Sequence, residues 1–122
     1  MDMNETVETL NLNDLIEYSD QRQVRKKFIQ TDIIVSEIVC YEPGQVTKMH
    51  VHPHQDEIFY CMEGEGAITF AEQEDIPIFP GSVVFVPSGI RHGAETANGT
   101  RLVIMFTKGP GLANPTRNKK AV

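Results

Sequence analysis

The sequence predicts an all-β protein, a sandwich or barrel assembled from many short strands. Nine segments rich in β-branched and aromatic residues follow one another between residues 24 and 107, and Gly, Pro, Asn or Asp separates most of them. Helical patterns are nearly absent, which argues against a parallel sheet wrapped by helices. Many short strands without helices are typical of sandwiches and barrels.

The expected elements begin with a short helical turn and continue as strands. The turn follows Asn13, a good N-cap, because Asp14 and Glu17 then lie where the helix dipole favours acids. Strands are expected at residues 24–30, 33–42, 45–52, 56–62, 66–71, 76–79, 82–86, 92–97 and 100–107. Residues 33–39 (IIVSEIV) and 102–106 (LVIMF) are apolar on both faces, so both faces must be covered. A second subunit is the simplest cover, and we therefore expect a homodimer.

The composition is that of an ordinary globular protein and limits its partners. A length of 122 residues suffices for one packed core. The chain has 11 Lys and Arg against 17 Asp and Glu, and its net charge of −6 argues against nucleic acid as a partner. No apolar run is long enough to span a membrane, and the N-terminus lacks a secretory signal. We therefore expect a cytoplasmic protein with no membrane partner.

The charge is uneven and divides the chain into three parts. Residues 1–20 form an acidic extension without Lys or Arg, residues 21–107 form the strand-rich barrel, and residues 108–122 form a basic tail without acids. Cys40 and Cys61 each lie inside an apolar run, which is typical of reduced, buried thiols.

All four histidines fall in two short windows. His50, His52 and His54 lie in MHVHPHQDE, and His92 follows the turn PSGIR. Residues i and i+2 of a strand point to the same side, so His50 and His52 project together, and Glu57 follows at the next strand start. An isolated His-x-His pair is common on protein surfaces, but imidazoles with a nearby carboxylate form a donor set for divalent transition metals.

The spacing of these residues resembles the two sequence motifs of the cupin family. The first motif is Gly, five residues, His-x-His, three or four residues, Glu, six residues and Gly. Every position is matched, by Gly44, His50, His52, Glu57 and Gly64. The second motif is Gly, five residues, Pro-x-Gly, two residues, His, three residues and Asn. It is matched by Gly81, Pro87, Gly89 and His92, and departs only where Thr96 replaces the usual Asn.

The resemblance implies a double-stranded β-helix, the cupin jelly-roll barrel, that holds one divalent metal through His50, His52, Glu57 and His92. The missing Asn is not a metal ligand in the family, so the ligand set is complete. Three neutral imidazoles and one carboxylate leave a divalent ion with a charge of about +1 and, if it is octahedral, about two open positions. This set favours Fe(II), Mn(II) or Ni(II), and Zn(II) or Cu(II) also fit.

The family includes dioxygenases, decarboxylases, isomerases, epimerases, lyases, cyclases and non-enzymatic binders, so the resemblance implies no single reaction. We expect a metal-dependent small cupin enzyme, an oxygenase that acts on a small hydroxylated or keto compound. The alternatives are a non-oxidative lyase, isomerase or decarboxylase, and a non-catalytic cupin that binds a metal or small molecule.

Three further side chains are weaker catalytic candidates. Lys48 shares the strand parity of His50, and Arg91 lies at the barrel rim, so either cation could pair with an anionic substrate group. His54 lies near the barrel mouth, where it could act as an acid or base. Each could equally be an ordinary solvated surface residue.

The remaining interior is expected to be apolar. Phe59 and Cys61 share a strand face with Glu57 and should line the barrel with it. The other expected wall residues are Val46, Phe85 and either Leu102, Ile104 and Phe106 or their neighbours. Such a dry pocket suits a small, partly hydrophobic or aromatic substrate.

Overall fold

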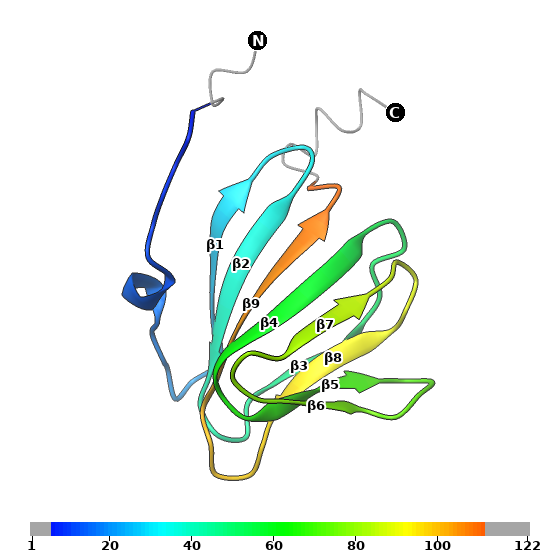
Figure 1. Ribbon diagram of the computed structural model, residues 1–122. Coiled ribbons are helices and arrows are strands. Elements are labelled where there is room, and N and C mark those ends of the chain that lie inside the picture. The colour runs from blue at the N-terminus through cyan, green and yellow to red at the C-terminus, as the bar shows by residue number, and fades with distance from the viewer. Residues whose placement is uncertain (1–5, 112–122) are drawn as a thin grey trace.

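Two antiparallel sheets packed face to face form the fold in the computed structural model, which describes residues 6–111 (Figure 1). The five-stranded sheet has the order β1-β2-β9-β4-β7, and the four-stranded sheet has the order β3-β8-β5-β6. The strands are β1 (Val24–Gln30), β2 (Val35–Tyr41), β3 (Val46–His50), β4 (Asp56–Gly64), β5 (Gly66–Phe70), β6 (Ile76–Ile78), β7 (Val83–Val86), β8 (His92–Thr96) and β9 (Leu102–Gly109). This is the jelly-roll barrel that the sequence motifs imply.

All nine predicted strands are present, and their ends differ from the predictions by no more than two residues. The largest consequence is at β9, which runs to Gly109 and so places Lys108 in the sheet rather than in a tail. Of the predicted basic tail, residues 108–122, Gly109 also lies in β9, Pro110 and Gly111 follow that strand, and residues 112–122 lie outside the described part of the chain.

The N-terminal turn is a 3-10 helix, η1 (Leu12–Leu15). Its cap is Asn11, whose side-chain oxygen accepts a hydrogen bond from the Asn13 amide at 2.9 Å, and not Asn13 as predicted. Asn11 takes this place because its backbone is still extended, as capping requires. Within residues 6–111, no helix has the length and apolar character needed to cross a membrane.

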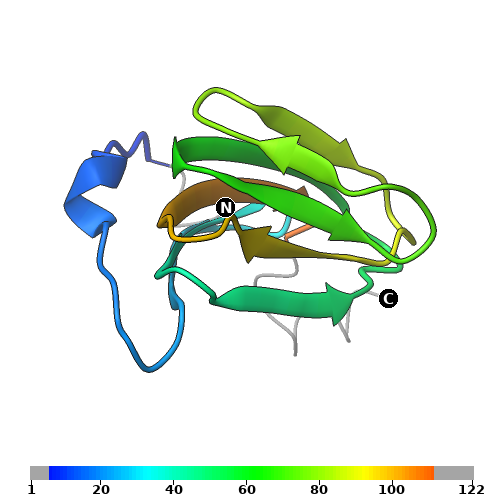
Figure 2. The ribbon, with the colours of Figure 1, turned by 90° about the horizontal axis from the view of Figure 1, so that it is seen from below.

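The main core lies between the two sheets, and the strands of both sheets surround it (Figure 2). Phe59 and Cys61 point into it, as predicted, and β9 contributes Leu102, Ile104 and Phe106. The thiol of Cys61 is free, as is that of Cys40 on the other side of the sheet.

Two predicted wall residues lie outside instead. Val46 is 48% exposed and Phe85 is 60% exposed. Phe85 pairs with Ile58 on the outer face, while its neighbours Val84 and Val86 are buried. The run VVFV is apolar at every position, so its sequence does not reveal which residues face inward.

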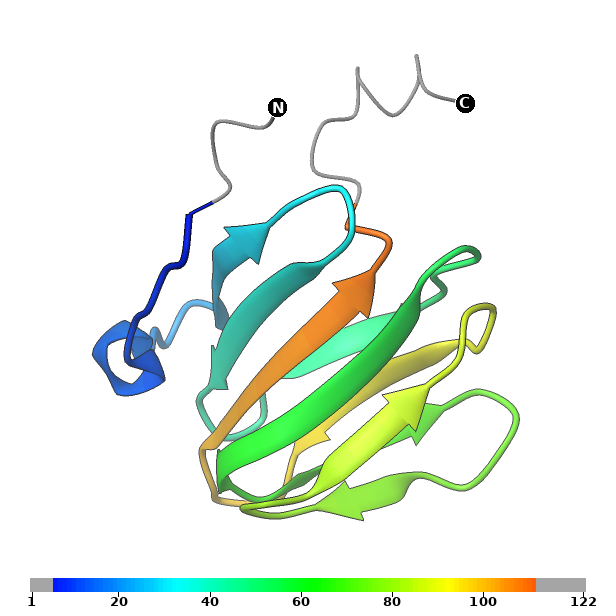
Figure 3. The same cartoon turned by 45° about the horizontal axis from the view of Figure 1, so that its top comes forward.

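The outer face of the five-stranded sheet is also apolar, and the N-terminal segment of the same chain covers part of it (Figure 3). Ile38, Cys40 and Val103 are buried there. The partly buried residues packed against them are Leu12, Leu15, Ile16, Tyr18, Val24, Phe28 and Met62. Part of the cover that the outer face of β2 requires is thus supplied by the same chain. The homodimer that this apolar pattern suggested stays a prediction.

Candidate metal site

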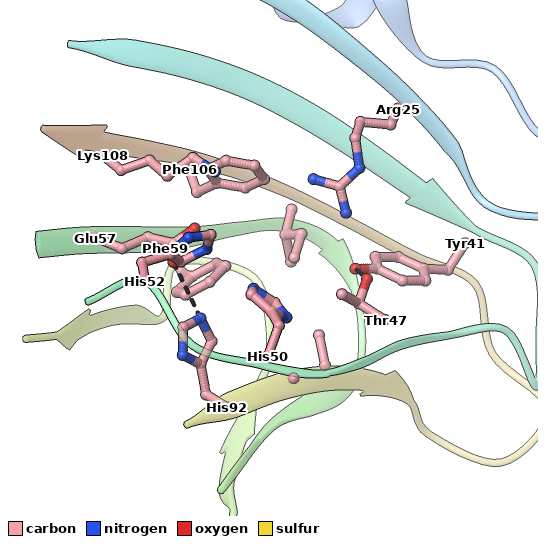
Figure 4. A pocket seen from close by; sticks show the side chains of 13 residues that line it. Arg25, Tyr41, Thr47, His50, His52, Glu57, Phe59, His92, Phe106 and Lys108 are labelled. Carbon is pink, nitrogen blue, oxygen red and sulfur yellow. Dashed lines mark hydrogen bonds and ion pairs between the residues drawn. The ribbon is translucent and has the colours of Figure 1, made fainter. Parts of the chain in front are cut away.

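Four side chains predicted to bind metal converge in one cavity between the sheets (Figure 4). His50 ends β3, His52 follows it, Glu57 lies at the start of β4, and His92 begins β8. One candidate ligand atom from each residue lies within 4.8 Å of all the others. Glu57 and His92 are almost fully buried, with exposed side-chain fractions of 3% and 2%.

The pairing of β3 with β8 brings the two motifs together. His50 pairs with His92 across the strands, and their ring centroids are 4.6 Å apart. Gly93 allows this close approach, because a Cβ atom there would lie only 2.5 Å from the Thr47 carbonyl oxygen. A glycine next to the His92 ligand therefore has a packing role that no larger residue can fill without moving β3.

A shift in the register of β3 between Thr47 and His50 decides which side chains face the cavity. Both of these residues line it, although they are three positions apart. Strict alternation would place His50 with Lys48 instead. The predicted shared parity of Lys48 and His50 is therefore wrong, because the irregularity reverses the phase of the strand.

Hydrogen bonds from the backbone orient two of the imidazoles. Nδ1 of His50 lies 2.8 Å from the Lys48 carbonyl oxygen, and Nδ1 of His92 lies 2.8 Å from the Ile90 carbonyl oxygen. A carbonyl oxygen only accepts, so each Nδ1 carries the hydrogen and donates. The Nε2 atoms are then the ones free to bind a metal, and the rings are held in place for it.

Burial and charge make the three imidazoles unequal. Burial lowers the pKa of His52 to about 4, with a further contribution from the Lys108 ammonium. Burial also lowers the pKa of His50. For His92, burial is the largest single effect and acts in the same direction, but the hydrogen bonds to Glu57 and to the Ile90 carbonyl, together with the charge of Glu57, outweigh it and raise the pKa. His50 and His52 are therefore neutral at pH 7 and need lose no proton to bind a metal.

The spacing of the donor atoms fits a cation among them. Nε2 of His92 lies 3.0 Å from Oε1 of Glu57, and Nε2 of His52 lies 3.6 Å from the same oxygen. Two atoms that both present lone pairs at 3.0 Å need a proton or a metal ion to share. Ligands about 2.1 Å from one ion and at right angles to each other are about 3.0 Å apart. The donor set, two of whose members are buried, therefore fits a divalent ion.

The cavity has a volume of about 250 Å³, and its other polar lining residues were not expected from the sequence. They are Arg25, Tyr41, Thr47 and Lys108. A signal for Lys108 was available, because it continues the inward alternation of Ile104 and Phe106. Its place in a basic, Pro- and Gly-rich C-terminal stretch obscured that signal.

One end of the cavity is held by a chain of neutral hydrogen-bonding groups. The Tyr41 hydroxyl lies 2.7 Å from Oγ1 of Thr47, and Oγ1 of Thr47 donates to the Gln23 side-chain carbonyl at 2.8 Å. Burial raises the pKa of Tyr41 to about 12, so this phenol is uncharged. The hydrogen-bonding groups at this end are therefore uncharged, and the nearby Arg25 guanidinium is the charged group that acts on Tyr41.

The three weaker candidates do not line this cavity. Lys48 is exposed and borders a hollow on the outer side of β3 and β8, and Arg91 borders another hollow beside Phe70. His54 is exposed in the turn between β3 and β4.

Cys61, expected to be a wall residue, is packed in the core, and burial raises the pKa of its thiol to about 11.

Comparison with known proteins agrees with this arrangement. Residues 37–107 match the family described as Cupin domain. A glucose-6-phosphate isomerase from Thermococcus gammatolerans is 28% identical, and the match covers 77% of this chain and 65% of that protein. An oxalate-binding protein from Thermotoga maritima is 37% identical over 49% of each chain. An L-ectoine synthase from Halomonas elongata is 35% identical over 54% of this chain and 48% of that protein.

The chain thus spans between about half and two thirds of the length of these curated relatives. Solved structures match more fully. A double-stranded β-helix protein from Klebsiella pneumoniae has a TM-score of 0.80 at 20% identity, and the match covers 89% of this chain and 95% of that one. An RmlC-like cupin from Desulfovibrio desulfuricans has a TM-score of 0.77 at 22% identity, with 86% and 98% covered. With its fold, its two motifs and this family match in agreement, the chain belongs to the cupin family.

Proposed function

We propose that this chain is a metal-dependent enzyme that holds one divalent transition metal through His50, His52, Glu57 and His92 and acts on a small hydroxylated or keto compound. The observation that carries the proposal is the buried pair of His92 and Glu57, whose donor atoms face each other at 3.0 Å with Nδ1 of the histidine already committed to a carbonyl. Fe(II), Mn(II) and Ni(II) fit this set best.

The chain's own residues would perform three tasks around the ion. The backbone carbonyls hold the imidazoles of His50 and His92 in the tautomer that leaves Nε2 free. Phe59, Ile104 and Phe106 supply an apolar wall that excludes water and strengthens electrostatic interactions. The ion, when bound, supplies Lewis acidity toward a substrate oxygen and, for redox-active metals, a means of reacting with dioxygen.

Oxygenation is the reaction that we propose first, because a metal with about two open positions can hold substrate and dioxygen together. Non-oxidative isomerase or lyase chemistry is the second candidate, and the names of two relatives, an isomerase and a synthase, favour it. Binding without catalysis is the third, and the oxalate-binding relative favours that reading. The buried free thiols of Cys40 and Cys61 are compatible with a reducing compartment, and we propose the cytoplasm.

Metal content tests the first part of the proposal. Wild-type protein purified without a His tag and dialysed should retain about one transition-metal ion per chain by elemental analysis. Changes to a residue that only supports a ligand commonly cost about 10- to 100-fold in affinity, so His50→Ala and Glu57→Gln should each retain less than about a tenth of this content. His54→Ala removes an exposed histidine and should retain all of it. Equal metal content in all four proteins would contradict the proposed site.

Turnover tests the reaction. The protein loaded with each metal in turn is incubated with small 2-hydroxy and 2-oxo compounds under air and under nitrogen, and substrate loss and oxygen uptake are measured. Oxygenation predicts substrate loss only in air, with matching oxygen uptake. Equal rates under nitrogen would reject oxygenation and support isomerase, lyase or decarboxylase chemistry. Thermal stabilisation by a compound that is never consumed would support a binding protein.

A further inference from the structure

We propose that Lys108 and Arg25 form an anion subsite at the metal-binding cavity, and that it takes the carboxylate of a small 2-hydroxy or 2-oxo acid. This inference rests on the proposed function, because it names the substrate class of the same cavity. The subsite uses side chains of β9 and β1, and neither belongs to the two cupin motifs.

Lys108 is a half-buried cation beside the candidate metal ligands. It pairs with Glu57 across β9 and β4, so the two side chains leave the sheet on the same face with Cβ atoms about 5 Å apart. Its ammonium nevertheless lies 5.3 Å from the centre of the Phe106 ring, and it forms no ion pair with any residue of the described range 6–111. An ammonium held over an aromatic wall without a carboxylate partner can bind an anion that enters the cavity.

Arg25 approaches the same ring from the other direction. Its guanidinium carbon lies 5.5 Å from the Phe106 ring centre, and Figure 4 shows Arg25 and Lys108 on either side of that ring. One nitrogen of the guanidinium contacts Glu37 at 3.5 Å. A guanidinium has five N–H donors, so this single ion pair leaves most of them for a ligand. The two cations therefore flank one apolar surface.

The charges and the size of the cavity define the ligand. Glu57 and Glu37 offset two positive charges, but a divalent ion together with Lys108 and Arg25 carries four, so the cavity as a whole is cationic. A volume of about 250 Å³ is below the roughly 300–1,000 Å³ typical of sites for drug-sized molecules. The ligand is therefore small and anionic, with a short carbon skeleton against Phe106 and an oxygen donor for the metal.

A carboxylate fits better than a phosphate. Phosphate sites in proteins are commonly built on helix N-termini or Gly-rich loops that open a helix. The described residues contain only the 3-10 turn η1, and it does not line the cavity. A carboxylate needs only two or three donors in a plane, which a guanidinium and an ammonium can supply.

Affinity measurements test the subsite. Isothermal titration of the Mn(II)-loaded protein is carried out with glycolate and pyruvate, and with hydroxyacetone as a probe of similar size that lacks the carboxylate. Lys108→Met keeps the stem over Phe106 and removes the charge, so it should weaken glycolate and pyruvate by about 10- to 100-fold and leave hydroxyacetone unchanged. Arg25→Met should weaken the two acids in the same way. The matched control is Lys26→Met, on the outer face of β1, which should change none of these affinities.

Several outcomes would overturn the subsite. Acid affinities that are equal in wild type and Lys108→Met would reject it, and inorganic phosphate binding more tightly than either acid would reject the carboxylate class. Metal content, measured separately on each variant, reports on the proposed function. The titrations are repeated on metal-free protein, where weaker binding that still depends on Lys108 would support the subsite even if the proposed function failed. No dependence on Lys108 in either form would overturn it.

Discussion

The pair formed by His92 and Glu57 connects metal binding to proton release. His92 donates through Nδ1 to the Ile90 carbonyl, and its Nε2 lies 3.0 Å from Glu57, so without a metal a proton occupies the position between them. The raised pKa of His92 reflects this contact. A metal ion must displace that proton, whereas His50 and His52, whose pKa values are lowered, present free lone pairs.

Metal affinity should therefore depend on pH through His92. Below its raised pKa the imidazolium competes with the metal, so affinity should rise with pH until that pKa is passed and then level off. At pH 6.5 binding should release about one proton per ion, because the other two imidazoles are already neutral. Titration calorimetry in two buffers of different ionisation enthalpy measures this number. A value near three would show that all three histidines are protonated beforehand and would contradict the assignment.

The sequence predicted the positions of side chains correctly where a motif specified them. It was less reliable where the alternation of a strand decided which side chains face the cavity. The four candidate ligands come together as the motif spacing implied. Lys48 was expected beside His50 but points outward, because the register of β3 is irregular. Lys108 was expected in the tail but lines the cavity, because β9 extends two residues further. The register irregularity leaves no mark in the local hydrophobic pattern, because it depends on the partner strand. The inward position of Lys108 does continue the alternation of Ile104 and Phe106, but the basic stretch around it obscured that signal.

At the scale of elements, the N-terminal segment covers part of the apolar sheet face that a second subunit was expected to cover. Leu12, Leu15 and Tyr18 lie over the outer face of β2 and β9, where Cys40 is buried. The sequence showed that this face must be covered but could not show by what, since a distant segment and a second chain satisfy the same apolar pattern.

Removing this cover should expose Cys40. In the full chain carrying Leu12→Asp and Leu15→Asp, the thiol of Cys40 should react with a disulfide reagent at least about tenfold faster, because burial no longer protects it or raises its pKa. Cys61 should stay unreactive, since it lies in the core between the sheets. Mass spectrometry of the labelled protein identifies the cysteine that reacted. The control is Leu10→Asp, which changes a leucine that packs against neither cluster.

Strand positions were predictable to within two residues because Gly, Pro, Asn and Asp mark most strand ends. Which residues of β7 point inward was not predictable, because all four of its residues are apolar. Only the pairing with β4 decides that Val84 and Val86 face the core. The cap of η1 was misplaced for a similar reason, since Asn11 and Asn13 are equally good caps in isolation.

At the scale of the whole molecule, a part of the outer sheet face remains open. Ile58 and Tyr60 of β4 pair with Phe85 and Val83 of β7, and all four side chains are exposed. These residues form one apolar patch next to the region that the N-terminal segment covers. The homodimer predicted from the sequence therefore has a specific surface available to it, on the β4 and β7 side of the sheet.

Light scattering coupled to size exclusion tests this assembly. Wild-type protein should run as a dimer, and Phe85→Asp should weaken the association by about 100-fold or more, because the charge is buried twice across a two-fold axis. Lys48→Asp, on the other sheet, controls for the added charge and should leave the dimer intact. A wild-type protein that is monomeric at high concentration would contradict the prediction.

The close packing at Gly93 has a consequence for how this site can vary. Because its missing side chain lets β8 approach Thr47, the distance between the sheet partners His50 and His92 is fixed by main-chain contact rather than by the ligands themselves. A ligand sphere whose diameter is set by the backbone cannot expand freely to suit a larger ion. A larger residue at Gly93, which lines the cavity but offers no ligand atom, would therefore change the spacing of two candidate ligands.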